Sequence, residues 1–467
     1  MVSRPFLVRS ALALALIFAA DVRAATDADF AEIRDQIRQL KQSYEARIDA
    51  LEQRLKNAEA RAATAPPATQ PATTTPVAAS TAPAPAPSAA AGIAAFNPAI
   101  SAVLQGRYAN LSQDPNAYRI AGFAPGGDIG PGRRGLGLGE SELALSASVD
   151  DKFAGTLIVS LTPANTVSVE EAYGIVTALP DGLTPKFGRF FSGLGYLNEQ
   201  HQHAWDFVDA PLAYETFLGG QYGNDGLQLK WVAPTEQYLE FGAEIGNGDS
   251  FPGNQRNRNG AGAVVAYAHT GGDIGASHSW RAGLSYLHTK AQDREYTQTD
   301  TFGNDAPIGF SGVSDVAIAD FVWKYAPNGN TQTTSAKLQG EYFWRRERGN
   351  LTYDSDGKLA LTQTDAYRSP QRGWYLQGVW QFMPTWRVGA RYDRLDPGQV
   401  DYGANAAYLA TSSFAPQRYT MMFDWTPSEF SRLRLQLAQS KVRPEVTDNQ
   451  LFLQYILTIG AHGAHKF

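Results

Sequence analysis

Two histidines and two aspartates lie close together in the stretch Gly195–Glu215, which reads GYLNEQHQHAWDFVDAPLAYE. Nine residues hold all four of them: His201, His203, Asp206 and Asp209. Imidazole nitrogens and carboxylate oxygens bind divalent metal ions, and both groups can exchange protons in catalysis. The stretch therefore raises three possibilities: a metal site, a catalytic loop, or a polar segment that lines a pore.

The metal and catalytic interpretations each lack part of their usual pattern. An H-x-H pair in a loop is a weak metal signal without a third histidine nearby, although His201, His203 and Asp206 remain candidate ligands. The chain has no H-E-x-x-H motif and no G-x-S-x-G motif. Gly130–Gly135 matches a dinucleotide-binding pattern, but it contains a proline and no helix pattern follows. We therefore predict no enzyme activity and no cofactor.

The composition narrows the class of protein that could position this stretch. The 467 residues include no cysteine, which removes thiolate chemistry and disulfides. A mean hydropathy of −0.30 excludes a bundle of membrane helices, but it permits a membrane β-barrel, in which apolar and polar residues alternate. The formal net charge of −6 gives no reason to expect nucleic acid as a partner.

Alternation of apolar and polar residues recurs from Ile100 to Phe467 and predicts β-strands. Leu433, Leu435 and Leu437, for example, share one face, and Arg432, Arg434 and Gln436 share the other. We predict sixteen strands, at residues 100–110, 136–149, 154–162, 166–178, 184–191, 224–233, 237–247, 261–270, 277–289, 313–325, 333–345, 373–382, 385–395, 416–426, 429–440 and 449–461. Short turns alternate with long connections, among them 192–223, 290–312 and 346–372. This pattern predicts an antiparallel transmembrane β-barrel, with both barrel ends on the periplasmic, short-turn side.

Three segments precede the predicted barrel, which covers residues 96–467. Residues 1–24 combine two early arginines with a short apolar run and small residues, which is typical of a signal peptide. Residues 25–62 carry an apolar heptad stripe with one stutter, which predicts either a trimeric coiled coil or a helix packed on its own protein. Residues 63–95 are rich in Ala, Pro and Thr and predict a disordered linker.

The final strand pattern ends in an aromatic residue, Phe467. This resembles the C-terminal strand of bacterial outer-membrane proteins, in which such a residue is the signal that the assembly machinery reads. The resemblance predicts the outer membrane of a Gram-negative bacterium as the location, with the N-terminal stalk in the periplasm.

A second resemblance lies in Glu170–Phe191, EEAYGIVTALPDGLTPKFGRFF, which precedes the long connection at 192–223. A strand, a short LP-G-L turn and a strand ending in G-R-F resemble the phosphate-selective porin family (O/P type). That resemblance implies a sixteen-stranded barrel, usually trimeric, that passes small anions. It also implies that the third long loop, 192–223, folds inward and narrows the pore.

On this basis we predict a set of residues that line the pore or its constriction: Arg189, Glu199, His201, His203, Asp206, Asp209, Lys230, Arg387, Arg391, Arg432 and Arg434. The last four form either an anion-attracting track or ion pairs with Glu and Asp on neighbouring strands, and the sequence favours neither.

The expected function is passive diffusion of small polar solutes, with anion preference left open. Expected partners are outer-membrane lipid, further copies of the chain in a homotrimer, small ions or polar solutes, and the outer-membrane assembly machinery. Two alternatives remain at this stage: a metal or siderophore receptor, and a structural protein whose stalk contacts the periplasm or cell wall.

Overall fold

The computed structural model describes residues 98–460, apart from residues 125, 128, 164, 255–257 and 360. These residues belong to one compact unit, Pro87–Phe467. The predicted signal peptide (1–24), coiled coil (25–62) and linker (63–95) lie outside the described residues, as does the terminal Phe467. No helix of the described part is long and apolar enough to cross a bilayer.

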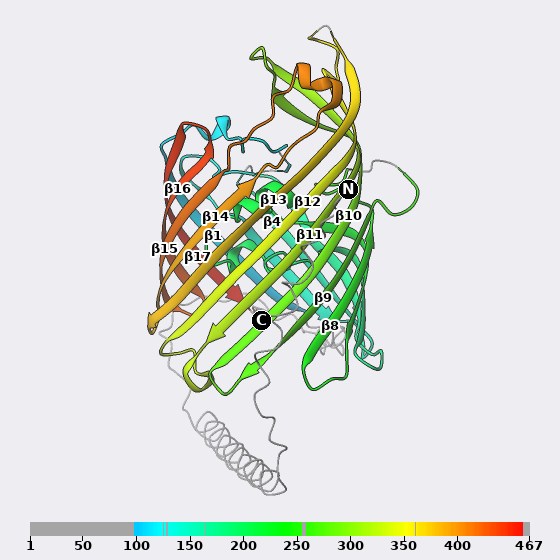
Figure 1. Cartoon of the computed structure of the whole chain (residues 1–467). Coiled ribbons are helices and arrows are strands. Elements are labelled where there is room, and N and C mark those ends of the chain that lie inside the picture. The colour runs from blue at the N-terminus through cyan, green and yellow to red at the C-terminus, as the bar shows by residue number, and fades with distance from the viewer. Residues whose placement is uncertain are drawn as a thin grey trace, which may run out of the picture. The chain divides into compact units, whose positions relative to one another are not determined.

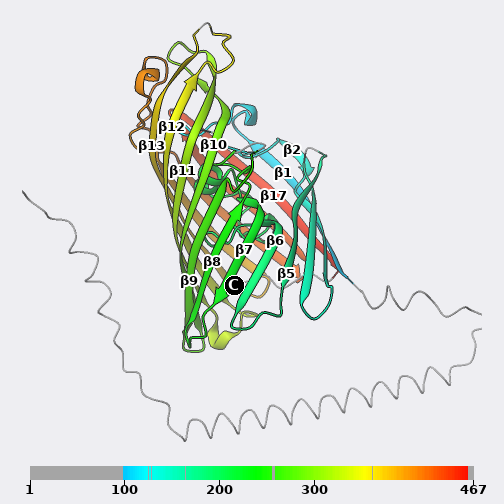
Figure 2. The ribbon, with the colours of Figure 1, turned by 90° about the vertical axis from the view of Figure 1, so that its right-hand side faces the viewer.

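The described residues form one closed, antiparallel β-sheet in which each strand pairs with its neighbours in sequence (Figures 1 and 2). The ring closes where β1 pairs with β17, from Ser101 opposite Gly460 to Leu111 opposite Gln450. The strands are β1 (Ala99–Leu111), β2 (Gly135–Leu138), β3 (Ser141–Ser148), β4 (Phe153–Leu161), β5 (Val167–Val176), β6 (Leu183–Phe191), β7 (Gly223–Val232), β8 (Tyr238–Gly246), β9 (Ala263–Ile274), β10 (His278–Thr299), β11 (Asp305–Tyr325), β12 (Ser335–Tyr353), β13 (Gln363–Met383), β14 (Trp386–Asp396), β15 (Gln417–Ser428), β16 (Ser431–Arg443) and β17 (Val446–Gly460). The helical turns are η1 (Pro115–Ala117), η2 (Gln202–Ala204), α3 (Leu212–Leu218), η3 (Pro327–Gly329) and η4 (Gly403–Ala407).

Two of these ranges, β2 and β3, are parts of one interrupted strand. Both pair with β1: Leu138 lies opposite Gly106, and Glu142 lies opposite Val103. The ladder breaks between them, at residues 139 and 140. The barrel therefore has sixteen strands, and the predicted fold class is confirmed.

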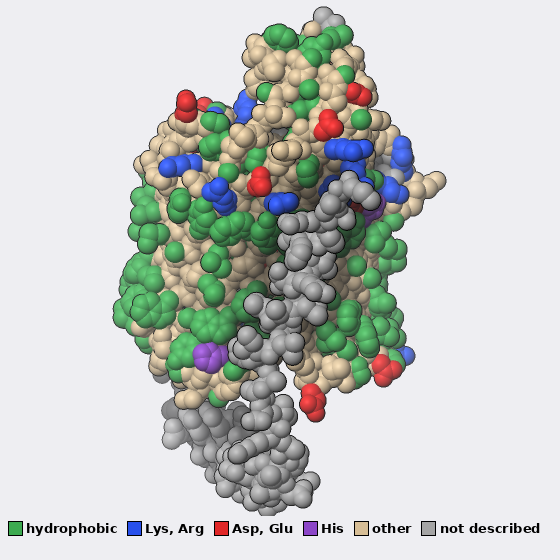
Figure 3. Space-filling model, viewed as in Figure 1, with side chains coloured by type: hydrophobic (Ala, Val, Ile, Leu, Met, Phe, Trp, Pro, Cys, Tyr) green, Lys and Arg blue, Asp and Glu red, His purple; other side chains and the backbone are tan. Residues whose placement is uncertain are grey.

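Side chains alternate between the two faces of the barrel wall, as the sequence pattern predicts. On β16 the leucines Leu433, Leu435 and Leu437 are exposed on the outer face, whereas Arg434 and Gln436 point inward and are buried. Figure 3 shows hydrophobic side chains spread over the outer face between the two rims. An apolar exterior around a polar interior is the arrangement that suits a barrel in a bilayer, because lipid surrounds the outside.

Four strands, β10 to β13, are much longer than the sequence pattern predicts, with 22, 21, 19 and 21 residues. The predicted loops 290–312 and 346–372 are wrong in most of their length, because these strands continue to turns at 300–304 and 354–362. Figure 2 shows the four strands rising beyond the rest of the rim. The outer face of the extensions is mostly polar: its exposed residues include Glu295, Arg346, Arg348 and Arg368. A buried cluster that includes Phe310, Tyr353 and Tyr367 holds the extensions together. The alternation of apolar and polar residues, on which the strand prediction depended, is therefore missing in the extensions.

Candidate functional site

The connection between β6 and β7, residues 192–222, is largely buried and contains η2 and α3. Every residue of α3 is buried. The helix starts after Pro211 and ends at Gly219, whose left-handed backbone (φ 68°) lets the chain turn back toward β7. We call residues 192–222 the β6–β7 segment.

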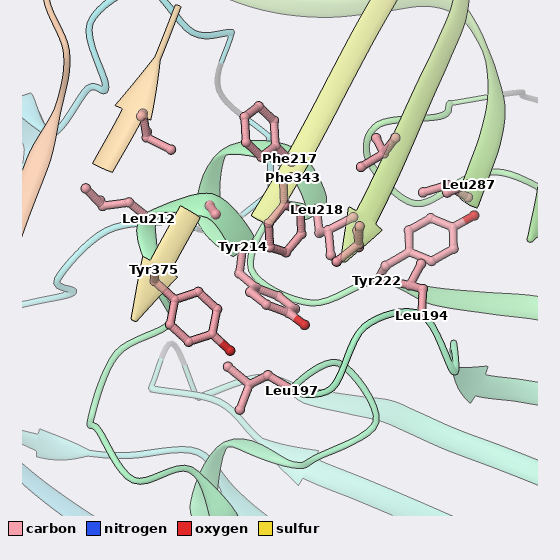
Figure 4. Close-up of a cluster of buried hydrophobic side chains, with 14 of the residues drawn as sticks. Leu194, Leu197, Leu212, Tyr214, Phe217, Leu218, Tyr222, Leu287, Phe343 and Tyr375 are labelled. Carbon is pink, nitrogen blue, oxygen red and sulfur yellow. The ribbon is translucent and has the colours of Figure 1, made fainter. Parts of the chain in front are cut away.

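Aromatic packing attaches the β6–β7 segment to β12 and β13. Tyr214 and Phe217 of α3 pack against Phe343, with ring centroids 5.2 and 5.9 Å apart, and Tyr375 lies beside Tyr214 (Figure 4). These residues belong to a buried apolar cluster that also contains Leu194, Leu197 and Leu212 of the segment. Removing such large side chains from water provides much of the attraction between the segment and the barrel wall.

A single carboxylate, Glu341 of β12, accepts hydrogen bonds from four donors around this cluster. The backbone N–H groups of Tyr196 and Leu197 donate at 3.2 and 3.1 Å. The hydroxyls of Tyr214 and Tyr375 donate at 2.9 and 2.6 Å. Three of these donors come from the segment, so Glu341 fixes its entry and its helix to the same strand. A typical hydrogen bond within a protein contributes about 0.5–1.5 kcal/mol net.

The two aspartates of the opening motif bind basic residues of the wall. Asp206 forms ion pairs with Lys337 and Arg387. Asp209 pairs with Arg391 at 3.0 Å and with Arg418. Burial alone would raise the pKa of Asp209, but these two arginines outweigh it and hold the pKa below its usual value. Both aspartates therefore remain ionised at neutral pH and attach the segment to β12, β14 and β15.

The four arginines predicted as an anion track are mostly engaged in such pairs. Arg391 also pairs with Asp393, and Arg434 pairs with Asp424; both arginine side chains are 1% exposed. Arg387 contacts Asp424 and is 21% exposed. Arg432, at 23%, lies 4.0 Å from Asp424 and donates to the carbonyls of His203 and Trp205. Of the two interpretations of these arginines, pairing describes the arrangement found in the structure.

Beyond the β6–β7 segment, Arg387 and Arg432 border a hollow of about 390 Å³ next to the turns that join β13 to β14 and β15 to β16. These are the arginine side chains of the predicted track with appreciable exposure among the described residues. Any attraction of anions by this track would therefore act at the hollow.

The two histidines meet carboxylates from the opposite part of the barrel. His201 Nδ1 lies 3.1 Å from Glu170 Oε2 and 3.3 Å from Glu142 Oε2, and its Nε2 lies 3.0 Å from Glu171 Oε2. His203 Nδ1 lies 2.9 Å from Glu142 Oε1. Burial alone would lower the pKa of His201, but the neighbouring carboxylates outweigh it and raise the pKa well above its usual value.

A β-bulge explains how two consecutive glutamates reach one histidine. Ile158 of β4 lies opposite Glu171 of β5, and the next residue, Val159, lies opposite Val169, so Glu170 is the extra residue. Consecutive residues of a regular strand point to opposite faces, and a bulge changes that direction. Both carboxylates are therefore directed to the same imidazole.

The remaining predicted residues fall in two places. Lys230 of β7 pairs with Glu199 of the β6–β7 segment at 2.7 Å. Arg189 is not part of this assembly. Its side chain is 46% exposed, shares the outer face of β6 with Phe187, and pairs with Asp225 of β7 at 2.6 Å. Alternation from Lys186, which points inward, already predicts the outer face for Arg189.

Sequence analysis missed several residues that contact the segment, among them Glu142, Glu170, Glu171 and Arg418. The inward positions of Glu142 and Arg418 follow from alternation with the exposed Leu143 and Tyr419. The bulge at Glu170 leaves no sequence signal, and contacts between residues as distant as Glu215 and Arg418 depend on closure of the barrel.

A cavity of about 780 Å³ lies beside the segment, lined by side chains from β1 and from β3 to β10. Glu199, His201, His203 and Lys230 line it, together with Glu142, Glu171, Lys186, Glu240 and Arg281. Asp206, Asp209 and the four arginines of the predicted track are absent from this lining, among the described residues. The predicted set is therefore split between the cavity wall, the attachment of the segment, the second hollow at Arg387 and Arg432, and the outer face at Arg189.

Comparison with solved structures finds Gram-negative outer-membrane proteins of low sequence identity. An anion-selective porin from Comamonas acidovorans aligns over 78% of this chain and 99% of its own, with 11% identity and a TM-score of 0.48. The outer-membrane channel DcaP of Acinetobacter baumannii covers 78% and 97%, with 13% identity and a TM-score of 0.47. The trimer form of OmpT, an outer-membrane protein of Vibrio cholerae, covers 78% and 99%, with 13% identity and a TM-score of 0.48. At these values the likeness concerns the course of the chain and has no bearing on function.

Sequence comparison finds a nearer relative. No family model matches the chain. An uncharacterized protein of Aquifex aeolicus (strain VF5) is 31% identical over 351 residues, which are 72% of this chain and 71% of that protein. With that identity over more than two thirds of both proteins, the chain belongs to the same family as the Aquifex aeolicus protein.

Proposed function

We propose that this protein is an outer-membrane porin that allows passive diffusion of small polar solutes. The observation that carries the proposal is a closed barrel with an apolar exterior that holds a cavity of about 780 Å³ lined by charged side chains. A sixteen-stranded barrel is wide enough to enclose an aqueous channel. Receptors for metal chelates use about 22 strands and a plug, so the sixteen strands favour the diffusion channel over that alternative.

The β6–β7 segment is proposed to fold into the barrel as its constriction. In support, the segment contacts inward-facing residues of strands that lie far apart around the ring. Its histidines meet Glu142 and Glu171 of β3 and β5, and its aspartates meet Arg387 and Arg418 of β14 and β15. If the segment takes this course, the path that remains open to solutes is the cavity lined by β1 and by β3 to β10.

Charge selectivity follows from which side chains remain beside that path. The cavity lining includes the carboxylates of Glu142, Glu171, Glu199, Glu240 and Asp273, against the cations Lys186, Lys230 and Arg281 and the imidazoles of His201 and His203. Anion preference would depend on Arg387 and Arg432 at the other hollow, because the remaining arginines of the track are buried in ion pairs. We propose weak selectivity with cations slightly favoured, and we transfer no phosphate selectivity from the resemblance of Glu170–Phe191.

The wider setting of the channel is also part of the proposal. The apolar outer face supports contact with outer-membrane lipid, and the resemblance to sixteen-stranded porins supports a homotrimer. Phe467 would be the residue that the assembly machinery reads. With an even number of strands, the start of the first strand and the end of the last strand lie on the same side of the barrel. That side would be periplasmic, and the stalk at 25–62 would then lie in the periplasm.

Planar-bilayer recording tests the proposal. Folded protein should give stable single channels. The reversal potential across a KCl gradient should be shifted slightly from zero toward the equilibrium potential of K⁺. Folded protein that gives no conductance would refute the porin function. A reversal potential close to the chloride value would refute the proposed charge preference and leave the channel intact.

A further inference from the structure

The contacts of His201 with Glu142, Glu170 and Glu171 exceed what one imidazole can satisfy. Its Nδ1 carries at most one proton, yet Glu170 and Glu142 both approach that nitrogen, at 3.1 and 3.3 Å. Glu171 approaches the other nitrogen at 3.0 Å. One N–H cannot point at two separate carboxylates with good geometry, so at least one of these contacts lacks a well-aligned hydrogen.

The charge of the cluster is also unbalanced. Glu142, Glu170 and Glu171 place three carboxyl groups against the imidazoles of His201 and His203, so in the sum of these five side chains the acidic groups exceed the basic ones by one. The five side chains that make the sum are between 4% and 15% exposed. Excess negative charge with so little contact with water favours an additional cation.

The same atoms have the spacing of a metal site. One donor atom each from Glu142, Glu170 and His201 lies within 4.8 Å of the other two. A metal ion about 2.0–2.2 Å from each of its tetrahedral ligands holds the ligand atoms about 3.3–3.6 Å apart. His201 Nδ1 lies 3.1 Å from Glu170 Oε2 and 3.3 Å from Glu142 Oε2, which is close to that separation. Glu142, Glu171, His201 and His203 also line the cavity of about 780 Å³, which provides a route for an ion to enter.

We propose that Glu142, Glu170 and His201 form a binding site for a divalent first-row transition-metal ion such as Zn²⁺. A ligand set that combines imidazole nitrogen with carboxylate oxygen suits these ions, whereas Mg²⁺ and Ca²⁺ prefer oxygen alone. Glu171 lies on the far nitrogen of His201 and orients the ring. His203, whose ring stacks on His201 at 5.8 Å, orients Glu142. The site needs the barrel fold but not the diffusion function.

The test is isothermal titration of the full-length, tag-free mature protein in detergent with ZnCl₂, after removal of metal with a chelator. Wild-type protein should bind one more equivalent of Zn²⁺ than His201→Gln. Glu170→Gln and His201→Gln should each weaken that binding at least about tenfold. Binding of Mg²⁺ and Ca²⁺ should be much weaker.

His288→Gln is the matched control. His288 also contacts a carboxylate, Asp315 at 2.8 Å, but its side chain is 33% exposed and lies outside the cluster. This variant should bind Zn²⁺ as wild type does. Every variant retains His462 and His465, so any Zn²⁺ that these two residues bind is the same in all of them and cancels in the comparison with wild type. The heat-dependent shift in gel mobility of folded barrels checks that every variant is folded.

Two results would overturn the proposal. One is Zn²⁺ binding of equal stoichiometry and affinity in wild type and both ligand variants. The other is binding of Mg²⁺ or Ca²⁺ as tight as that of Zn²⁺ and insensitive to His201→Gln. Both are measured without a bilayer, so they are independent of the conductance experiment: channels without a metal site would refute this inference alone, and a metal site without channels would refute the porin function alone.

Discussion

Arg418 is 2% exposed and contacts four groups of the described chain that are far from it in sequence: the side chains of Tyr118, Asp209 and Glu215 and the carbonyl of Ala210. A buried ion pair contributes little net stability compared with apolar residues of the same size, but removing one partner leaves an uncompensated charge. The same argument applies to Arg391 and Arg434. We therefore interpret these arginines as fixed attachments of the β6–β7 segment rather than as binding groups for solutes.

Replacing Arg418 with alanine should destabilise the attachment by about 3–5 kcal/mol, because Asp209 and Glu215 lose a buried partner. The expected result is larger or noisier single-channel conductance and a lower midpoint of denaturant unfolding. Arg189→Ala is the matched control, because its pair with Asp225 is about half exposed and such pairs contribute about 0–1 kcal/mol. Equal effects of the two substitutions would contradict the assignment.

Acidification should loosen the same attachment. The pKa values of Asp206 and Asp209 are lowered in the folded protein from the usual 3.8. A group with a lowered folded pKa contributes stability that is fully present above its unfolded pKa and is lost as pH falls through the folded value. Conductance should therefore stay constant from pH 7 to about 4 and change below the usual value of 3.8. A change centred near pH 6 would assign the attachment to other groups.

At the scale of elements, the β6–β7 segment keeps its course through one short helix and the turns that flank it. The helix α3 has seven residues, too few to be stable alone, so its stability comes from packing on β12 and β13. Its end at Gly219 needs a left-handed backbone that glycine adopts without a steric penalty.

Gly219→Ala should lower the free energy of unfolding by about 1–2 kcal/mol, because the added Cβ is strained at φ 68°. The control is Gly106→Ala in β1, where an added Cβ would have no atom within 4 Å and φ is not positive. That substitution should change stability little. Denaturant unfolding of both variants measures the difference, and a Gly219→Ala protein as stable as the control would contradict the role of the turn.

At the scale of the whole molecule, the barrel closes on itself through strands that begin at Ala99 and end at Gly460. The ladder between β1 and β17 uses the pairing groups of both terminal strands, so no edge remains to be covered in this sheet. The barrel should therefore require none of the residues predicted as stalk and linker.

A chain that retains its signal peptide but lacks residues 25–92 should still insert and conduct, with single-channel conductance equal to that of wild type. If the stalk contacts the cell wall, the same deletion should weaken the attachment of the envelope, which electron microscopy of the cells would show. Loss of conductance on deletion would contradict the independence of the barrel.

The sequence by itself determined the sixteen strands and the side of the wall on which most side chains lie. That information is local, because alternation repeats within each strand and an apolar face must meet lipid. Tertiary structure decided which charges meet. Two of these ion pairs, Glu142 with His203 and Glu215 with Arg418, form only once the ring is closed and the β6–β7 segment has taken its course. It also decided that Glu170 joins Glu171 through a bulge, and that β10 to β13 extend beyond the rest of the rim. In both cases the stabilising contacts come from residues distant in sequence, and no local period encodes them.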